Sequence, residues 1–173
     1  MQISLQKTET GGHRSTAQLS DGTRVLAFGS DHPHRVPHEF SHFLIERQLG
    51  LDWGYWGSIA RGALFRGMSV LDGDEAAAAK RSASLKQSVM ARIQVAEDLV
   101  GAVEGVLPLE AGRSPEQARA KIIEEHPELA ETPAAGLDLA ELDRLMTEAA
   151  RTWAELPVGC EVRLTWDIPL VAR

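Results

Sequence analysis

The chain has 173 residues, a length typical of one domain, so we expect a single domain over residues 1–173 with its own hydrophobic core. Its 25 acidic residues outnumber the 18 basic ones, which argues against a nucleic acid as partner. The one cysteine, Cys160, cannot form an internal disulfide, and the first residues lack a basic region followed by a long apolar run. We therefore expect a cytoplasmic protein. Three charged residues interrupt the most apolar stretch, 51–68, which favours a core helix over a membrane span.

The first thirty residues have the alternation of β-strands. Ile3 and Leu5 point one way while the polar residues between and beside them point the other. A second short strand is expected near residues 13–19. Asp-Gly at 21–22 is a strong hairpin signal, and residues 23–28 supply the return strand. The sequence therefore predicts an amino-terminal three-stranded antiparallel meander.

Helical spacing begins after the meander. Pro37 suits the first turn of a helix, because its missing N–H would have no partner there, and Gly50 ends this first helix. Asp52 can cap a second helix, in which apolar residues of 56–64 follow the helical period. We expect this second helix to reach Met68.

Three more helices are expected after a turn at residues 71–74. A long apolar stripe over 85–107 has the helical period. Residues 114–117 form a capping box with proline at the first helical position, which starts a short helix that ends before Pro127. The same capping logic recurs at the start of a last helix over 138–156.

The chain then finishes with a strand. Cys160, Val162, Leu164 and Trp166 share one face of it, so we interpret Cys160 as a small buried hydrophobe and not as a nucleophile. A closing strand most economically joins the meander. The predicted fold is α+β: an antiparallel sheet of four strands with about five helices on one face.

The sharpest chemical signal is the pentapeptide His38-Glu39-Phe40-Ser41-His42. Histidines four residues apart lie one turn apart on the same side of a helix, so both imidazoles can reach one metal ion. In zinc hydrolases with this spacing, the glutamate after the first histidine acts as general base on a metal-bound water. The pattern predicts His38 and His42 as metal ligands, Glu39 as the catalytic base and zinc as the cofactor.

A third ligand is harder to assign. The extended metzincin pattern requires glycine and histidine where this chain has Ile45 and Gln48, so that subclass is excluded. Glu46 lies eight residues after His38, a rise of about 12 Å, so orientation of a ligand or a salt bridge with Arg47 is its expected role. A carboxylate of the long helix could complete the site as in gluzincins. Glu97, adjacent to Asp98, is the candidate.

Two alternatives remain for the histidines. His32 and His34 precede the helix, so a loop that folds back could supply ligands, or these side chains could simply lie in solvent. The helix is also apolar on both sides, since Phe40 and Phe43 lie opposite the histidine side. His38 and His42 could therefore be neutral core residues held by hydrogen bonds.

Residues 36–46, followed by Leu49-Gly50-Leu51 and by Gly-Tyr-Trp-Gly at 54–57, resemble a group of small, functionally uncharacterised bacterial proteins. Members carry a comparable His-acid-x-x-His-aromatic-x-x-Glu helix followed by a glycine and aromatic segment. The likeness includes the amino-terminal hairpin and residues 153–166, and it implies a fold but no activity. Aspartate often stands in those proteins where this chain has Glu39. The local resemblance of the pentapeptide is to zincin metallopeptidases.

These observations lead to two hypotheses. The first is a divalent-metal protein, and specifically a zinc-dependent hydrolase acting on an unidentified small molecule or protein. The second is a non-catalytic interaction module that binds a protein partner or forms a homodimer. The histidine helix and the helix from Trp53 to Met68 would then pack as core or as a partner surface. Trp53, Tyr55 and Trp56 could form an exposed binding or dimer patch, although aromatic residues at helical spacing are usually core.

Overall fold

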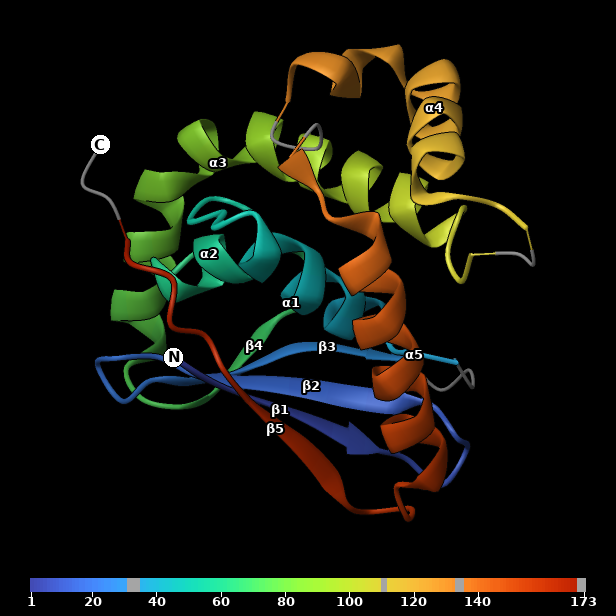
Figure 1. Ribbon diagram of the computed structural model, residues 1–173. Helices are drawn as coiled ribbons and strands as arrows, with labels where there is room; N and C mark the ends of the chain where they lie inside the picture. The colour runs from blue at the N-terminus through green and yellow to red at the C-terminus, as the bar shows by residue number, and fades with distance from the viewer. Residues whose placement is uncertain (31–34, 110–111, 133–135, 171–173) are drawn as a thin grey trace.

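The computed structural model describes residues 1–30, 35–109, 112–132 and 136–170, with the backbone alone for 86–88 and 91. The predicted α+β class is confirmed, because helices cover one face of an antiparallel sheet (Figure 1). The strands are β1 (Gln2–Lys7), β2 (His13–Gln18), β3 (Arg24–Ser30), β4 (Ser69–Asp72) and β5 (Glu161–Thr165). The helices are α1 (His38–Gln48), α2 (Tyr55–Ala60), α3 (Glu75–Glu104), α4 (Pro115–Glu125), α5 (Leu139–Glu155) and the 3-10 helix η1 (Pro127–Glu131).

The sheet has the strand order β4-β3-β2-β1-β5. The predicted meander is present, and β5 joins it by pairing antiparallel with β1, so that Ile3 faces Ala17 on one side and Leu164 on the other. The fifth strand was not expected, since residues 71–74 were predicted as a turn. β4 is a short, mostly exposed edge strand in which Val70 alone packs against the sheet cluster, so it has no alternating apolar pattern to detect.

Helix α1 lies between the sheet and α3. Phe40 and Phe43 belong to the hydrophobic cluster that covers the sheet, together with Ile3 and Leu5 of β1. Ile45, on the opposite side of α1, belongs to a second cluster formed with α3, α4 and α5. In Figure 1 α3 passes over α1 on the side away from the sheet. Helix α1 is therefore apolar on two sides because it is buried on both. Its histidine side faces α3.

The start and end signals of three helices are confirmed. Ser114 accepts a hydrogen bond from the backbone N–H of Gln117, whose side chain accepts one in return, which is the predicted capping box. Asp138 caps α5. Gly50 follows α1 with φ +63°, a backbone conformation that glycine adopts without strain.

Two predictions about the second helix are wrong. It ends at Ala60 and not near Met68, because Gly62 takes φ +97° and breaks the helical path. Asp52 does not cap the helix. Its buried carboxylate forms an ion pair with Arg61 instead, while Gly54 occupies the capping position.

Cys160 also differs from expectation, since it is exposed and precedes β5 in the tight turn that follows Pro157. The inward alternation starts two residues later, with Val162 and Leu164 packed against the sheet cluster. Within the described ranges, no helix combines the length and apolar character needed to cross a bilayer.

Candidate metal centre

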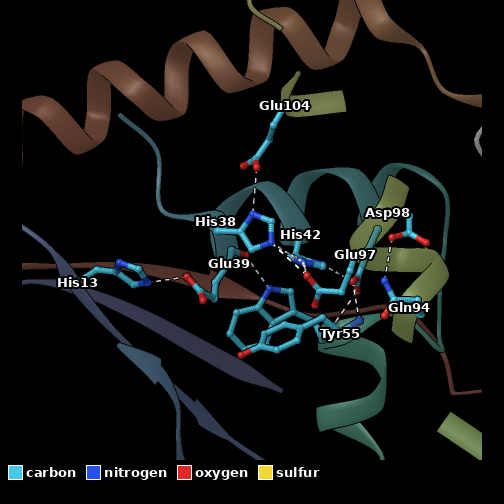
Figure 2. Close-up of polar contacts among 11 residues, drawn as sticks. His13, His38, Glu39, His42, Tyr55, Gln94, Glu97, Asp98 and Glu104 are labelled. Atoms are coloured by element: carbon cyan, nitrogen blue, oxygen red, sulfur yellow. Dashed lines mark hydrogen bonds and ion pairs between the residues drawn. The ribbon is translucent and has the colours of Figure 1, made fainter. Parts of the chain in front are cut away.

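His38 and His42 come together on the side of α1 that faces α3. Their rings lie 4.7 Å apart between centroids and perpendicular to each other, and their Nε2 atoms are 3.2 Å apart (Figure 2). Pro37 fixes the start of the helix one residue before His38, and Phe40 and Phe43 anchor the opposite side on the sheet. The predicted pairing of the two imidazoles is therefore present.

Glu97 of α3 completes a group of three. Its Oε2 lies 3.3 Å from the Nε2 of His38 and 3.3 Å from the Nε2 of His42. One ligand atom from each residue thus falls within a single small volume. The structure brings the predicted third ligand to the site, whereas the neighbouring Asp98 accepts a hydrogen bond from Gln94 instead (Figure 2).

The three ligand atoms form a nearly equilateral triangle with edges of 3.2–3.3 Å. Zinc bound to imidazole nitrogen and carboxylate oxygen at about 2.0–2.1 Å in a tetrahedron holds its ligand atoms about 3.3 Å apart. The triangle thus has the dimensions of one face of such a tetrahedron. Two imidazoles and one carboxylate are also a ligand set that divalent metals accept at hydrolytic sites.

The second ring nitrogen of each histidine faces another carboxylate. Nδ1 of His38 lies 3.0 Å from Oε2 of Glu104, and Nδ1 of His42 lies 2.9 Å from Oε1 of Glu46. When a neutral imidazole donates its Nδ1–H to a carboxylate, the Nε2 atom is left with a lone pair. Both Nε2 atoms lie 3.3 Å from Oε2 of Glu97. This carboxylate–histidine arrangement orients and strengthens histidine ligands in metal sites.

Glu46 is held rigidly by the start of α2. Its carboxylate is fully buried and accepts hydrogen bonds from the backbone N–H groups of Tyr55 (2.6 Å) and Trp56 (3.1 Å). Free N–H groups at a helix start favour a negative charge. Gly54 permits this contact, because a Cβ there would collide with the Glu46 carboxylate. Glu46 therefore orients His42, as expected, and does not pair with Arg47, which binds Asp167.

The surrounding carboxylates favour positive charge at the triangle. Hydrogen bonds to Glu104 and Glu97 raise the pKa of His38 to about 10. Burial alone would lower the pKa of His42, but its hydrogen bonds to Glu46 and Glu97 outweigh burial and raise the pKa to about 9. The same contacts with the histidines hold the pKa of Glu97 well below its usual range. Protons or a metal cation can supply the positive charge that this group needs.

Glu39, predicted as the general base, lies apart from the three ligand atoms. Its carboxylate is buried against the sheet, where Oε2 lies 2.5 Å from Nε2 of His13 on β2 (Figure 2). Its backbone carbonyl accepts a hydrogen bond from the indole N–H of Trp56. Glu39 and His13 thus form a buried pair that connects α1 with the sheet.

The site is open on one side. His42 is buried, with 1% of its side chain exposed, whereas His38 and Glu97 expose 40% and 38% of theirs. His38 and Glu104 also line a pocket of about 490 Å³ between α1, α3 and α5. Of the three triangle residues, only His38 is among the residues that line this pocket.

Two residues of this network were missed by sequence reasoning. Glu104 follows Glu97 by seven residues, which places both on the same side of α3, and this spacing could have identified it. His13 faces inward in the alternation of β2, but such a position is usually apolar and gave no chemical signal. The candidates His32 and His34 lie outside the described residues.

Searches against protein-family models, curated proteins and solved structures gave no match. We therefore infer the function from the geometry of the site.

Proposed function

We propose that this protein binds one zinc ion through His38, His42 and Glu97, and that the ion serves a hydrolytic reaction. The observation that carries this proposal is the triangle of ligand atoms with edges of 3.2–3.3 Å. Hydrogen bonds between these residues could also produce close contacts. The carboxylate at Nδ1 of each histidine gives additional support, because a neutral imidazole that donates its Nδ1–H has its Nε2 atom available to a metal.

Three protein ligands distinguish reactive zinc sites from structural ones, which usually have four. When zinc is bound in this way, it supplies a Lewis acid and lowers the pKa of a coordinated water towards neutrality. His38 and Glu97, which are partly exposed, lie on the accessible side, while His42 and Glu46 hold the site from the buried side. The proposal does not depend on Glu39, whose role as general base stays a prediction.

The rival hypothesis of an interaction module stays a prediction, and the structure bears only on its aromatic residues. Trp56 is fully buried and Tyr55 is 9% exposed, and both belong to the core that covers the sheet. Trp53 is half-buried against the second cluster. Tyr55 and Trp56 are therefore core, and Trp53 packs partly against the second cluster, so the three do not form the exposed patch considered from the sequence.

Metal content tests the proposal. Untagged protein purified without chelators should contain close to one zinc per chain by inductively coupled plasma mass spectrometry. The double variant His38→Ala/His42→Ala should remain folded by circular dichroism and lose the metal. Iron, manganese, cobalt and nickel should be measured in the same samples, because two histidines and a carboxylate also suit iron(II). Absence of any stoichiometric metal, even after zinc is supplied, would refute the proposal.

Two matched controls separate ligands from neighbours. Glu97→Ala should lose zinc while Asp98→Ala, one residue away on the same helix, should retain it. His126→Ala removes a partly exposed histidine that hydrogen-bonds Glu128 at the end of α4, away from the triangle, and should also leave zinc bound. Loss of zinc in either control variant would contradict the assignment of ligands.

A further inference from the structure

A groove of about 470 Å³, which we call the basic groove, lies where the end of β1 meets the last turns of α5 (Figure 1). Three basic side chains from separate parts of the chain line it, namely Lys7 of β1, Arg35 ahead of α1 and Arg151 of α5. Among the described residues, no acidic side chain lines this groove. The chain as a whole has 25 acidic and 18 basic residues, so this local excess of positive charge favours an anionic ligand.

Lys7 is fixed in the basic groove by the end of α5. Its ammonium donates hydrogen bonds to the backbone carbonyls of Trp153 (2.9 Å) and Ala154 (3.3 Å) and lies 5.7 Å from the centre of the Trp153 ring. An ammonium has three N–H donors, so one is left for a ligand. Because the position of this cation is already set, an anion that binds it loses little free energy to the ordering of the side chain.

Arg35 and Arg151 are exposed, and within the described ranges neither has a carboxylate partner. Glu148, one turn before Arg151 on α5, pairs with Arg144 instead. A guanidinium without an acidic partner keeps five N–H donors in a fork that fits carboxylate and phosphate oxygens. Both arginines are therefore available to an external anion.

The basic groove has room for more than a simple ion. Its volume is in the range of small-molecule sites, and a bare phosphate or sulfate ion would fill only a small part of it. Thr147, Ala150 and Trp153 of α5 are among its other lining residues. The groove therefore suits an anionic group attached to a small organic body.

The number of cations favours a dianionic group over a single carboxylate. A carboxylate can accept one bidentate pair of hydrogen bonds from one guanidinium, which would leave the other arginine and Lys7 without a counter-charge. A phosphate monoester carries about two negative charges at neutral pH and has three acceptor oxygens, so it can bind more than one of these cations at once.

We infer that the basic groove binds a small phosphate monoester, with its phosphoryl group against Lys7, Arg35 and Arg151 and its organic body along α5. None of the three residues of the metal triangle lines this groove. Binding there is thus independent of the zinc ion.

Amide NMR titrations of the full, isotope-labelled chain test the inference. Phenyl phosphate should bind with a dissociation constant of about 1 mM or tighter and shift the amide signals of Lys7 and of residues 147–154. Benzyl alcohol, benzoate and inorganic phosphate are the matched probes, since they lack the anion, the second charge and the organic body, respectively. Each should bind at least about tenfold more weakly than phenyl phosphate.

Arg35→Met and Arg151→Met each remove one exposed guanidinium and should weaken phenyl phosphate binding by about tenfold, as expected for the loss of one charge-assisted hydrogen-bond pair. Arg24→Met removes an exposed arginine on the sheet face opposite the helices and should leave the affinity unchanged. The His38→Ala/His42→Ala variant should also retain the affinity, because the basic groove is separate from the metal triangle.

Lack of phenyl phosphate binding at about 10 mM would overturn the inference. So would an affinity that persists in both arginine variants, or equal affinities for phenyl phosphate and any of the matched probes. Loss of binding in the double histidine variant would assign the phosphate to the metal and contradict binding in the groove. A chain that binds no zinc would refute the metal centre and leave this inference intact.

Discussion

Removal of the carboxylate behind His38 gives the sharpest test of how the metal centre is organised. Glu104 lies 3.0 Å from Nδ1 of His38 and is itself 32% exposed, so its replacement should leave the fold intact. Loss of such an outer carboxylate typically weakens metal binding by about 10–100-fold, or about 1.4–2.8 kcal/mol. Glu104→Gln keeps an acceptor for Nδ1–H and loses only the charge, so we expect about tenfold. Glu104→Ala loses both and should approach about a hundredfold.

Competition with a chromophoric zinc chelator measures these dissociation constants, and urea unfolding of the metal-free variants shows whether the fold is unchanged. Asp98→Ala, on the same helix, is the control for loss of one acidic residue near the site. If Glu104→Ala left the zinc dissociation constant within about twofold of the native value, the carboxylate–histidine argument would be refuted.

Three other perturbations are predicted by the structure. Carboxylates raise the pKa of His38 to about 10 and that of His42 to about 9, so zinc must displace about two protons near neutral pH. The apparent zinc affinity should therefore rise from acid towards alkaline pH. Calorimetry in buffers of different ionisation enthalpy should detect the released protons. Glu39→Ala removes the carboxylate that contacts buried His13 and should lower the free energy of unfolding by about 1–3 kcal/mol, while the protein still binds one zinc per chain. Loss of zinc from the folded variant would show that Glu39 contributes to the metal site. Gly54→Ala should weaken both thermal stability and zinc affinity, since its methyl group would displace Glu46, whereas Gly101→Ala in α3 meets no neighbouring atom and should raise the melting temperature.

The regular parts of the fold could be predicted because their signals are local. The alternation of Ile3 and Leu5 gave the first strand, and the capping residues Ser114 and Asp138 gave two helix starts. The edge strand β4 was missed, since its four residues have little inward-facing surface. The second helix was predicted too long because apolar spacing continued past Gly62, where the backbone adopts a positive φ.

The candidate site could be predicted only where its spacing is set by one helix. His38 and His42 are neighbours by helical geometry alone, and Glu97 was selected as an acidic residue in the middle of α3. Whether Glu97 would meet the histidines depends on how α3 packs on α1, which no local pattern encodes. The same holds for Glu39, since its position in the pentapeptide suggests a base, whereas the packing of α1 on the sheet directs it to His13.

The central claim is that one metal ion sits at the triangle of His38, His42 and Glu97. Crystals of zinc-loaded protein, with diffraction data collected on both sides of the zinc absorption edge, test it most directly. The account predicts a single anomalous peak about 2.0–2.2 Å from both Nε2 atoms and from a carboxylate oxygen of Glu97. A zinc-loaded crystal without a peak at that point, or with its zinc bound to other residues, would contradict it.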